Sequence, residues 1–166
     1  MQLSPEQLST LKLALAADPT LAAIPNNPDG NELVADAFNV KEATFTVWKP
    51  RVLQQEIADA FVDTEMANIT ALSLDRFRTL VSLRPNGFPV SASSRAAMED
   101  IWSGAAGAVA RGIMGNAGTI WRRLATRGEK LFANTASGNG ANATPATLTA
   151  EGEVTGANIL DARNRP

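Results

Sequence analysis

The chain has 166 residues, of which 45% are hydrophobic and only 5% aromatic, and its formal net charge is −2. This length suits about one domain with a real core, and the scarcity of aromatic residues favours helices over a β-sandwich. The absence of Cys, His and Tyr excludes disulfides and thiolate metal sites and removes the usual general base. We therefore predict no enzyme, no metal and no cofactor.

Charge is distributed unevenly along the chain. Residues 18–75 contain ten acidic residues against three basic ones, whereas residues 111–130 contain five basic residues against one acidic residue. The sequence shows no basic leader and no apolar run of the roughly 20 residues needed to span a bilayer. We therefore expect a soluble protein that is made in a cytoplasm and does not enter a membrane.

The first helix is predicted to begin after Ser4. Ser4 suits the N-cap, Pro5 the first helical position, and Gln7 the third position of a capping box. Leucines then recur at three- and four-residue spacing, which predicts one buried stripe. Asp18 precedes a proline and is expected to end the helix.

Three more helices and one extended segment are expected before residue 92. A helix is predicted at residues 31–39, and the short alternating segment 45–48 is interpreted as extended chain that lays Trp48 over the core. Further helices are predicted from Pro50 and from Ser73 as a cap. Residues 84–91 contain two prolines and a glycine, which predicts a break and a hinge.

The segment 95–133 carries two of the three tryptophans, Trp102 and Trp121, which with Trp48 are predicted to anchor the core. Its glycine-rich part, 104–118, is open to three interpretations: close helix packing, a bent or mobile connection, or a membrane-active segment.

A long helix is then predicted at residues 119–133, with Trp121 inward and the basic residues outward. The outward residues are Arg122, Arg123, Arg127 and Lys130. Such a face is either simply solvated or a contact for an acidic protein surface or for phosphate.

From residue 134 the composition changes to small polar residues without charge. Residues 134–146 are predicted to be a flexible linker, and residues 147–166 an arm that contains a short strand and a terminal helical turn. The arm is expected to dock on the body or on a partner, through Leu148, Val154 and Ile159. The predicted fold is mainly α: a compact five- to six-helix bundle, residues 1–133, with this extended C-terminal arm.

The chain contains no phosphate-binding loop, no dinucleotide fingerprint and no metal-binding motif. Several segments instead resemble a family of small proteins encoded among the virion-structure genes of tailed bacteriophages. They are F-T-V-W-K at residues 45–49, I-W-S-G-A-A-G at 101–107, and W-R-R-L-A-T-R-G-E-K-L-F-A at 121–133, followed by P-A-T-L at 145–148 and E-G-E at 151–153. The third segment is the most specific. The glycine-rich stretch before Trp121 departs from the continuous helix of that family.

The resemblance implies a structural subunit of the virion neck: a head-tail connector of the adaptor type, made in the host cytoplasm and incorporated in the virion. It implies a ring, twelve-fold or six-fold, that binds the portal protein through its C-terminal arm and a downstream tail or neck protein, with DNA passing through the lumen. We expect the acidic early helices of one subunit to meet the arginine face of the next.

Two alternatives remain. The first is a nucleic-acid-binding phage protein that uses Arg122, Arg123 and Arg127, and its binding would weaken steeply with salt. The second, a small hydrolase or lysis factor, is disfavoured by the missing His, Cys and Tyr. For the arm, we expect that deleting residues 147–166 leaves the helical body folded and abolishes docking.

Overall fold

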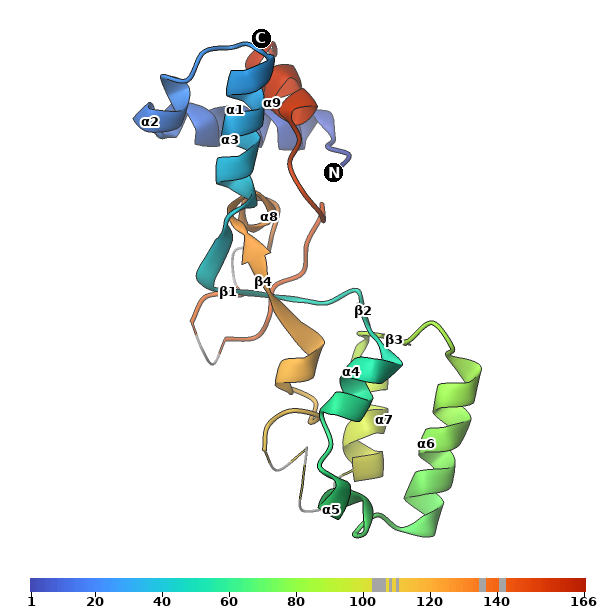
Figure 1. Ribbon diagram of the computed structural model, residues 1–166. Coiled ribbons are helices and arrows are strands. Elements are labelled where there is room, and N and C mark those ends of the chain that lie inside the picture. Colours follow the sequence, from blue (N-terminus) through green and yellow to red (C-terminus); the bar gives the residue numbers. More distant parts are fainter. Residues whose placement is uncertain (103–106, 108, 110, 135–136, 141–142) are drawn as a thin grey trace. The chain divides into compact units, whose positions relative to one another are not determined.

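The computed structural model describes residues 1–102, 107, 109, 111–134, 137–140 and 143–166, and these form two compact units (Figure 1). Unit 1 combines Met1–Val47 with Leu124–Pro166, and unit 2 is Trp48–Arg123. The chain therefore passes from one unit to the other twice. This division differs from the predicted body, linker and arm, because the C-terminal segment belongs to the same unit as the first helices.

Unit 1 begins as the sequence predicts. Helix α1 (Pro5–Ala17) starts with a complete capping box, in which the Ser4 hydroxyl accepts from the Gln7 N–H and the Gln7 side chain accepts from the Ser4 N–H. Asp18 ends α1 and at once caps the short helix α2 (Pro19–Ala22). Helix α3 (Pro28–Asn39) follows, capped by Asn27, so the prediction of a helix at 31–39 is confirmed with an earlier start.

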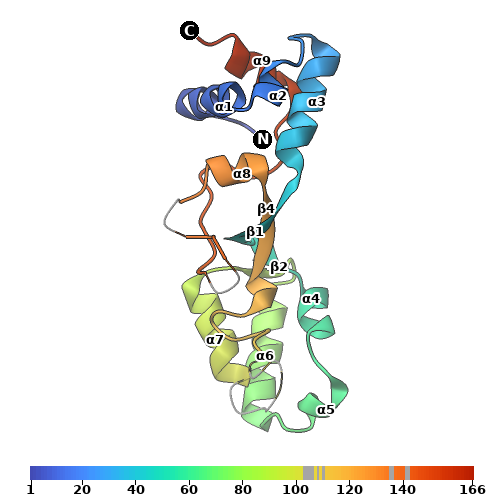
Figure 2. The ribbon, with the colours of Figure 1, turned by 90° about the vertical axis from the view of Figure 1, so that its left-hand side faces the viewer.

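The core of unit 1 is built from both ends of the chain. Helix α9 (Gly156–Arg163) packs against α1 and α3, as Figure 2 also shows. The buried hydrophobic residues of this core are Leu11, Leu15, Leu21, Val34, Ala35, Phe38, Phe132, Ala150, Val154, Ile159 and Ala162. The predicted docking arm is thus part of the hydrophobic core of unit 1.

Two strands that are far apart in the sequence form the first sheet. Strand β1 (Lys41–Trp48) pairs with β4 (Arg122–Thr126). The prediction of a mainly α-helical bundle is therefore wrong, and the fold is mixed α and β. Residues 119–133, expected to be one helix, comprise a 3-10 turn η1 (Thr119–Trp121), β4 and helix α8 (Arg127–Leu131). Pairing with β1 outweighs the local helical pattern there, because strand preference depends on packing context.

The described part of the predicted linker is bonded to β1. The Thr46 N–H donates to the Gly138 carbonyl at 2.8 Å, and the Ala146 N–H donates to the Thr46 carbonyl at 2.9 Å. Residues 135–136 and 141–142 lie outside the described residues. The short strand predicted in the arm is reduced, among the described residues, to a single bridge between Leu148 and Ala133.

Unit 2 is a helical unit with a small two-stranded sheet. Strands β2 (Arg51–Val52) and β3 (Phe88–Pro89) pair antiparallel. The helices are α4 (Gln54–Asp59), α5 (Asp63–Met66), α6 (Ala71–Leu83) and α7 (Ala92–Trp102). Helix α6 is capped by Thr70, not by the predicted Ser73. The prediction of a break at 84–91 fits the β3 segment that lies between α6 and α7.

The core of unit 2 gathers around two of the predicted anchors. Trp102 is 1% exposed and Trp121 is fully buried, whereas Trp48 is half-buried beneath the Arg95 guanidinium, whose carbon lies 3.9 Å from the ring centre. The three interpretations of residues 104–118 fall partly on residues 104–106, 108 and 110, which lie outside the described residues.

Candidate functional site

The four basic residues predicted as a contact do not share a helix face. Arg122 and Arg123 are consecutive residues of β4, and Arg127 and Lys130 belong to α8. Consecutive strand residues point to opposite faces. Arg122 Nη2 donates to the Ala117 carbonyl at 2.9 Å. The structure therefore divides the predicted basic face between two elements.

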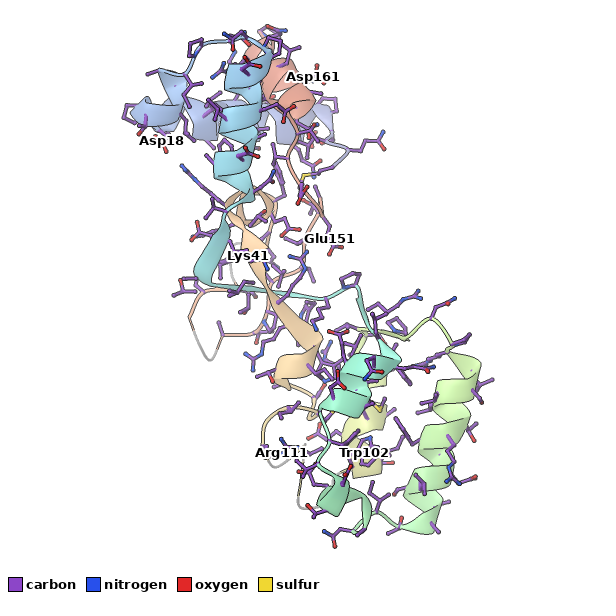
Figure 3. The ribbon with its side chains drawn as sticks, viewed as in Figure 1. Asp18, Lys41, Trp102, Arg111, Glu151 and Asp161 are labelled. Carbon is purple, nitrogen blue, oxygen red and sulfur yellow. The ribbon has the colours of Figure 1, made fainter. Side chains whose placement is uncertain are left out.

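Arg127 is engaged within unit 1. Its Nη2 lies 2.8 Å from Asp18 Oδ2, and its guanidinium carbon lies 5.1 Å from the centre of the Phe38 ring. Asp18, labelled in Figure 3, also accepts from the N–H groups of Thr20 and Leu21. The hydrogen bond from Arg127, followed by those within α2, lowers the pKa of Asp18 to about 2, because each favours the charged form.

Lys130 is engaged in a similar way. Its Nζ lies 3.4 Å from Glu42 Oε2 and 5.5 Å from the centre of the Phe45 ring. Two of the four predicted contact cations are therefore paired with carboxylates of their own chain.

Among the predicted arm contacts, Val154 is 2% exposed and Ile159 fully buried, and Leu148 packs against the small cluster around Phe45.

The most specific sequence segment, 121–133, contains a structural joint centred on Glu129. Thr126 and Glu129 form a capping box at the start of α8. Glu129 is 2% exposed. Its Oε2 accepts from the Thr126 N–H and its Oε1 from the Gly152 N–H, each at 3.0 Å. The buried carboxylate thus ties α8 to the C-terminal segment, and these charge-assisted bonds offset its desolvation.

Gly128 completes this joint by its lack of a side chain. A Cβ built on it would lie 2.6 Å from Val154 Cγ2 and 3.4 Å from the Phe38 carbonyl oxygen. Only glycine lets the backbone of α8 approach this closely. Gly128 and Glu129 therefore hold α8 against Phe38 of α3 and against the segment that precedes α9.

Unit 2 has a comparable ionic clamp. Arg111 Nε and Nη2 each donate to a Glu65 oxygen at 2.9 Å, and Nη2 also donates to the Ala60 carbonyl at 2.8 Å. Glu65 is 8% exposed, and a Cβ on Gly107 would lie 2.6 Å from its Cδ. The clamp fixes the chain after α7 onto α5; Arg111 is labelled in Figure 3.

The rest of unit 2 covers helix α6 only in part. None of its residues is buried, although Phe77 packs edge-on against Trp102 with ring centres 5.1 Å apart. A groove of about 460 Å³ runs beside it, lined by Gln54, Gln55, Ala58, Phe61, Asp63, Phe77 and Val81. A second groove, of about 420 Å³, lies on its α7 side. These open grooves mark α6 as a candidate docking element.

The described residues offer no cluster of three or more Asp or Glu side chains suited to a metal ion. Within the same described ranges, no helix is both long and apolar enough to cross a bilayer. Comparison with known protein families, curated proteins and solved structures finds no match to this chain.

The sequence analysis did not predict two of these features: the start of α8 at residue 127 and the exposure of α6. The pattern Thr126-Arg-Gly-Glu129 is a capping-box signature and could have placed a helix start at residue 127. The exposure of α6 had no such local signal, because its stripe of Leu74, Phe77, Leu80 and Val81 is typical of a fully packed helix.

Proposed function

We propose that this protein is a structural subunit of the neck of a tailed bacteriophage and acts by assembly, without catalysis. The observation that carries the proposal is the segment 121–133, which resembles that family. Two of its buried residues, Gly128 and Glu129, hold α8 in place within unit 1. A structural role of this kind suits a protein that acts by assembly.

In the proposed assembly, copies of the protein form a ring below the portal protein and meet a downstream tail or neck protein. The ring contact does not rest on Arg127 and Lys130, because these residues pair with Asp18 and Glu42 of their own chain. For the same reason, the alternative of a nucleic-acid-binding protein receives little support from them.

Mass spectrometry of density-purified virions tests the proposal. The protein is expected in intact virions at a copy number that matches a closed ring, and in the neck fraction after mild disruption. Its presence in infected cells together with its absence from virions would end the proposal. Salt-dependent DNA binding by the purified protein would favour the nucleic-acid alternative.

A further inference from the structure

Helix α3 presents an exposed stripe that nothing in unit 1 covers among the described residues. Asp29, Leu33, Asp36 and Val40 follow one another at spacings of four, three and four residues, which places them on one side of a helix. Leu33 is 60% exposed, and Val40, the cap residue directly after α3, is 63% exposed. We call these four residues the α3 stripe; it is acidic with two apolar members.

Helix α6 of unit 2 presents a second stripe with the same spacing. Its members are Leu72, Arg76, Thr79 and Leu83, with Leu72 62% and Leu83 72% exposed. Two of these residues, Arg76 and Thr79, also line the groove between α6 and α7. We call these residues the α6 stripe; it is basic with two apolar members.

The two stripes match at two positions when the helices run antiparallel. Val40 then lies opposite Leu72 as an apolar pair, and Asp36 lies opposite Arg76 as an ion pair. The other two positions, Leu33 opposite Thr79 and Asp29 opposite Leu83, each place an apolar side chain against a polar one. Arg76 is paired with Asp100 at 3.3 Å, but both side chains are more than half exposed. An exposed pair of this kind contributes little, so Arg76 can exchange partners.

The charges of the whole units point the same way. Unit 1 contains ten acidic and six basic residues, whereas unit 2 contains seven acidic and nine basic residues. From these observations we infer that the α3 stripe of one copy docks on the α6 stripe of a second copy. Opposite charge speeds such an encounter and disfavours pairing of like units.

The contact joins two different surfaces, so in a pair of copies one keeps its α6 stripe free and the other keeps its α3 stripe free, each for a further copy. Head-to-tail contacts of this type close into rings or continue as filaments. The inference deepens the proposed function, and its meaning as a ring contact rests on that function.

Charge exchange tests the contact with the full-length protein. Sedimentation velocity up to about 1 mM protein is expected to show self-association, which Asp36→Arg and Arg76→Asp should each weaken by at least about tenfold. An equimolar mixture of the two variants should associate again, because each stripe then meets its opposite charge. The controls Asp161→Arg on α9 and Arg78→Glu on another side of α6 should leave association unchanged.

Disulfide trapping gives a second readout, which is clean because the chain has no cysteine. Val40→Cys and Leu72→Cys proteins, mixed and oxidised, should form mixed dimers. Leu13→Cys, at an exposed position of α1, should form none with Leu72→Cys.

A wild-type protein that stays monomeric, or a variant mixture no better than its components, overturns the contact. Failure of the charge exchange in a protein found in virions removes the contact and leaves the proposed function standing. Successful exchange in a protein absent from virions confirms the contact and removes the proposed function.

Discussion

Gly128 lies where α8 meets Phe38 of α3 and Val154, which precedes α9. A methyl group there would overlap Val154 Cγ2 at 2.6 Å. We expect Gly128→Ala to lower the free energy of unfolding by about 1–3 kcal/mol, the usual effect of overpacking. Urea unfolding followed by circular dichroism measures this.

Gly115→Ala is the matched control for Gly128. Among the residues that the structure describes, its Cβ would meet only Val109 Cγ1, at an ordinary 3.7 Å, so the same substitution should change stability little. Equal effects of the two substitutions would contradict the close approach at α8.

Asp18 makes stability depend on pH. Its folded pKa is about 2, below the value of about 3.9 in an unfolded chain. Its charge therefore stabilises the folded protein fully above pH 4, and this contribution is lost as pH falls through about 2. We expect Asp18→Asn to be less stable than wild type at pH 6 and the difference to shrink toward pH 2, as measured by thermal unfolding across that range. A difference that stays constant with pH would exclude the Arg127 pair as its source.

At the scale of elements, α9 offers a direct comparison of buried and exposed neighbours. Ile159 is fully buried in the unit 1 core, whereas Leu160 is 43% exposed. We expect Ile159→Ala to cost about 2–5 kcal/mol, because it leaves a cavity. Leu160→Ala should cost much less, and denaturant unfolding distinguishes the two. Similar small losses for both would mean that α9 is a removable arm, as the sequence suggested.

The elements that sequence predicts correctly are those with local signals. The capping box of Ser4 and Gln7 and the proline after Asp18 bound α1 without any knowledge of the fold. Helix α3 is also found, although its start shifts by a few residues, as is common at helix ends.

The prediction fails where partners are distant. Strand β4 has helical spacing in its sequence, but it pairs with β1, which lies about 80 residues earlier. Gly138 and Ala146 of the predicted linker likewise find a distant partner, since both are hydrogen-bonded to Thr46 of β1. The predicted contact residues are affected by distant partners in the same way. Arg127 forms an ion pair with Asp18 and Lys130 with Glu42, and the sequence gives no local sign of either pair.

At the scale of the whole molecule, the two units should differ in whether they can fold without the rest of the chain. Unit 2 is one continuous segment with its own core of Val52, Ile57, Trp102, Trp121 and their neighbours. We expect a fragment of residues 48–123 to fold alone, with dispersed amide signals in a nitrogen–proton NMR spectrum. A fragment of residues 1–47 should stay largely unfolded, because its core needs α9. A collapsed spectrum for 48–123 would contradict this independence.

The chain's double passage between units also has a consequence during translation. Helices α1 and α3 emerge from the ribosome early, but α9, which covers Leu11 and Phe38 in the finished core, is synthesised more than a hundred residues later. At typical elongation rates, this leaves apolar surface uncovered for roughly 6–20 s. Unit 2 can fold during that interval, while residues 1–47 still lack the C-terminal part of their core. This is the period in which chaperones would bind the nascent protein.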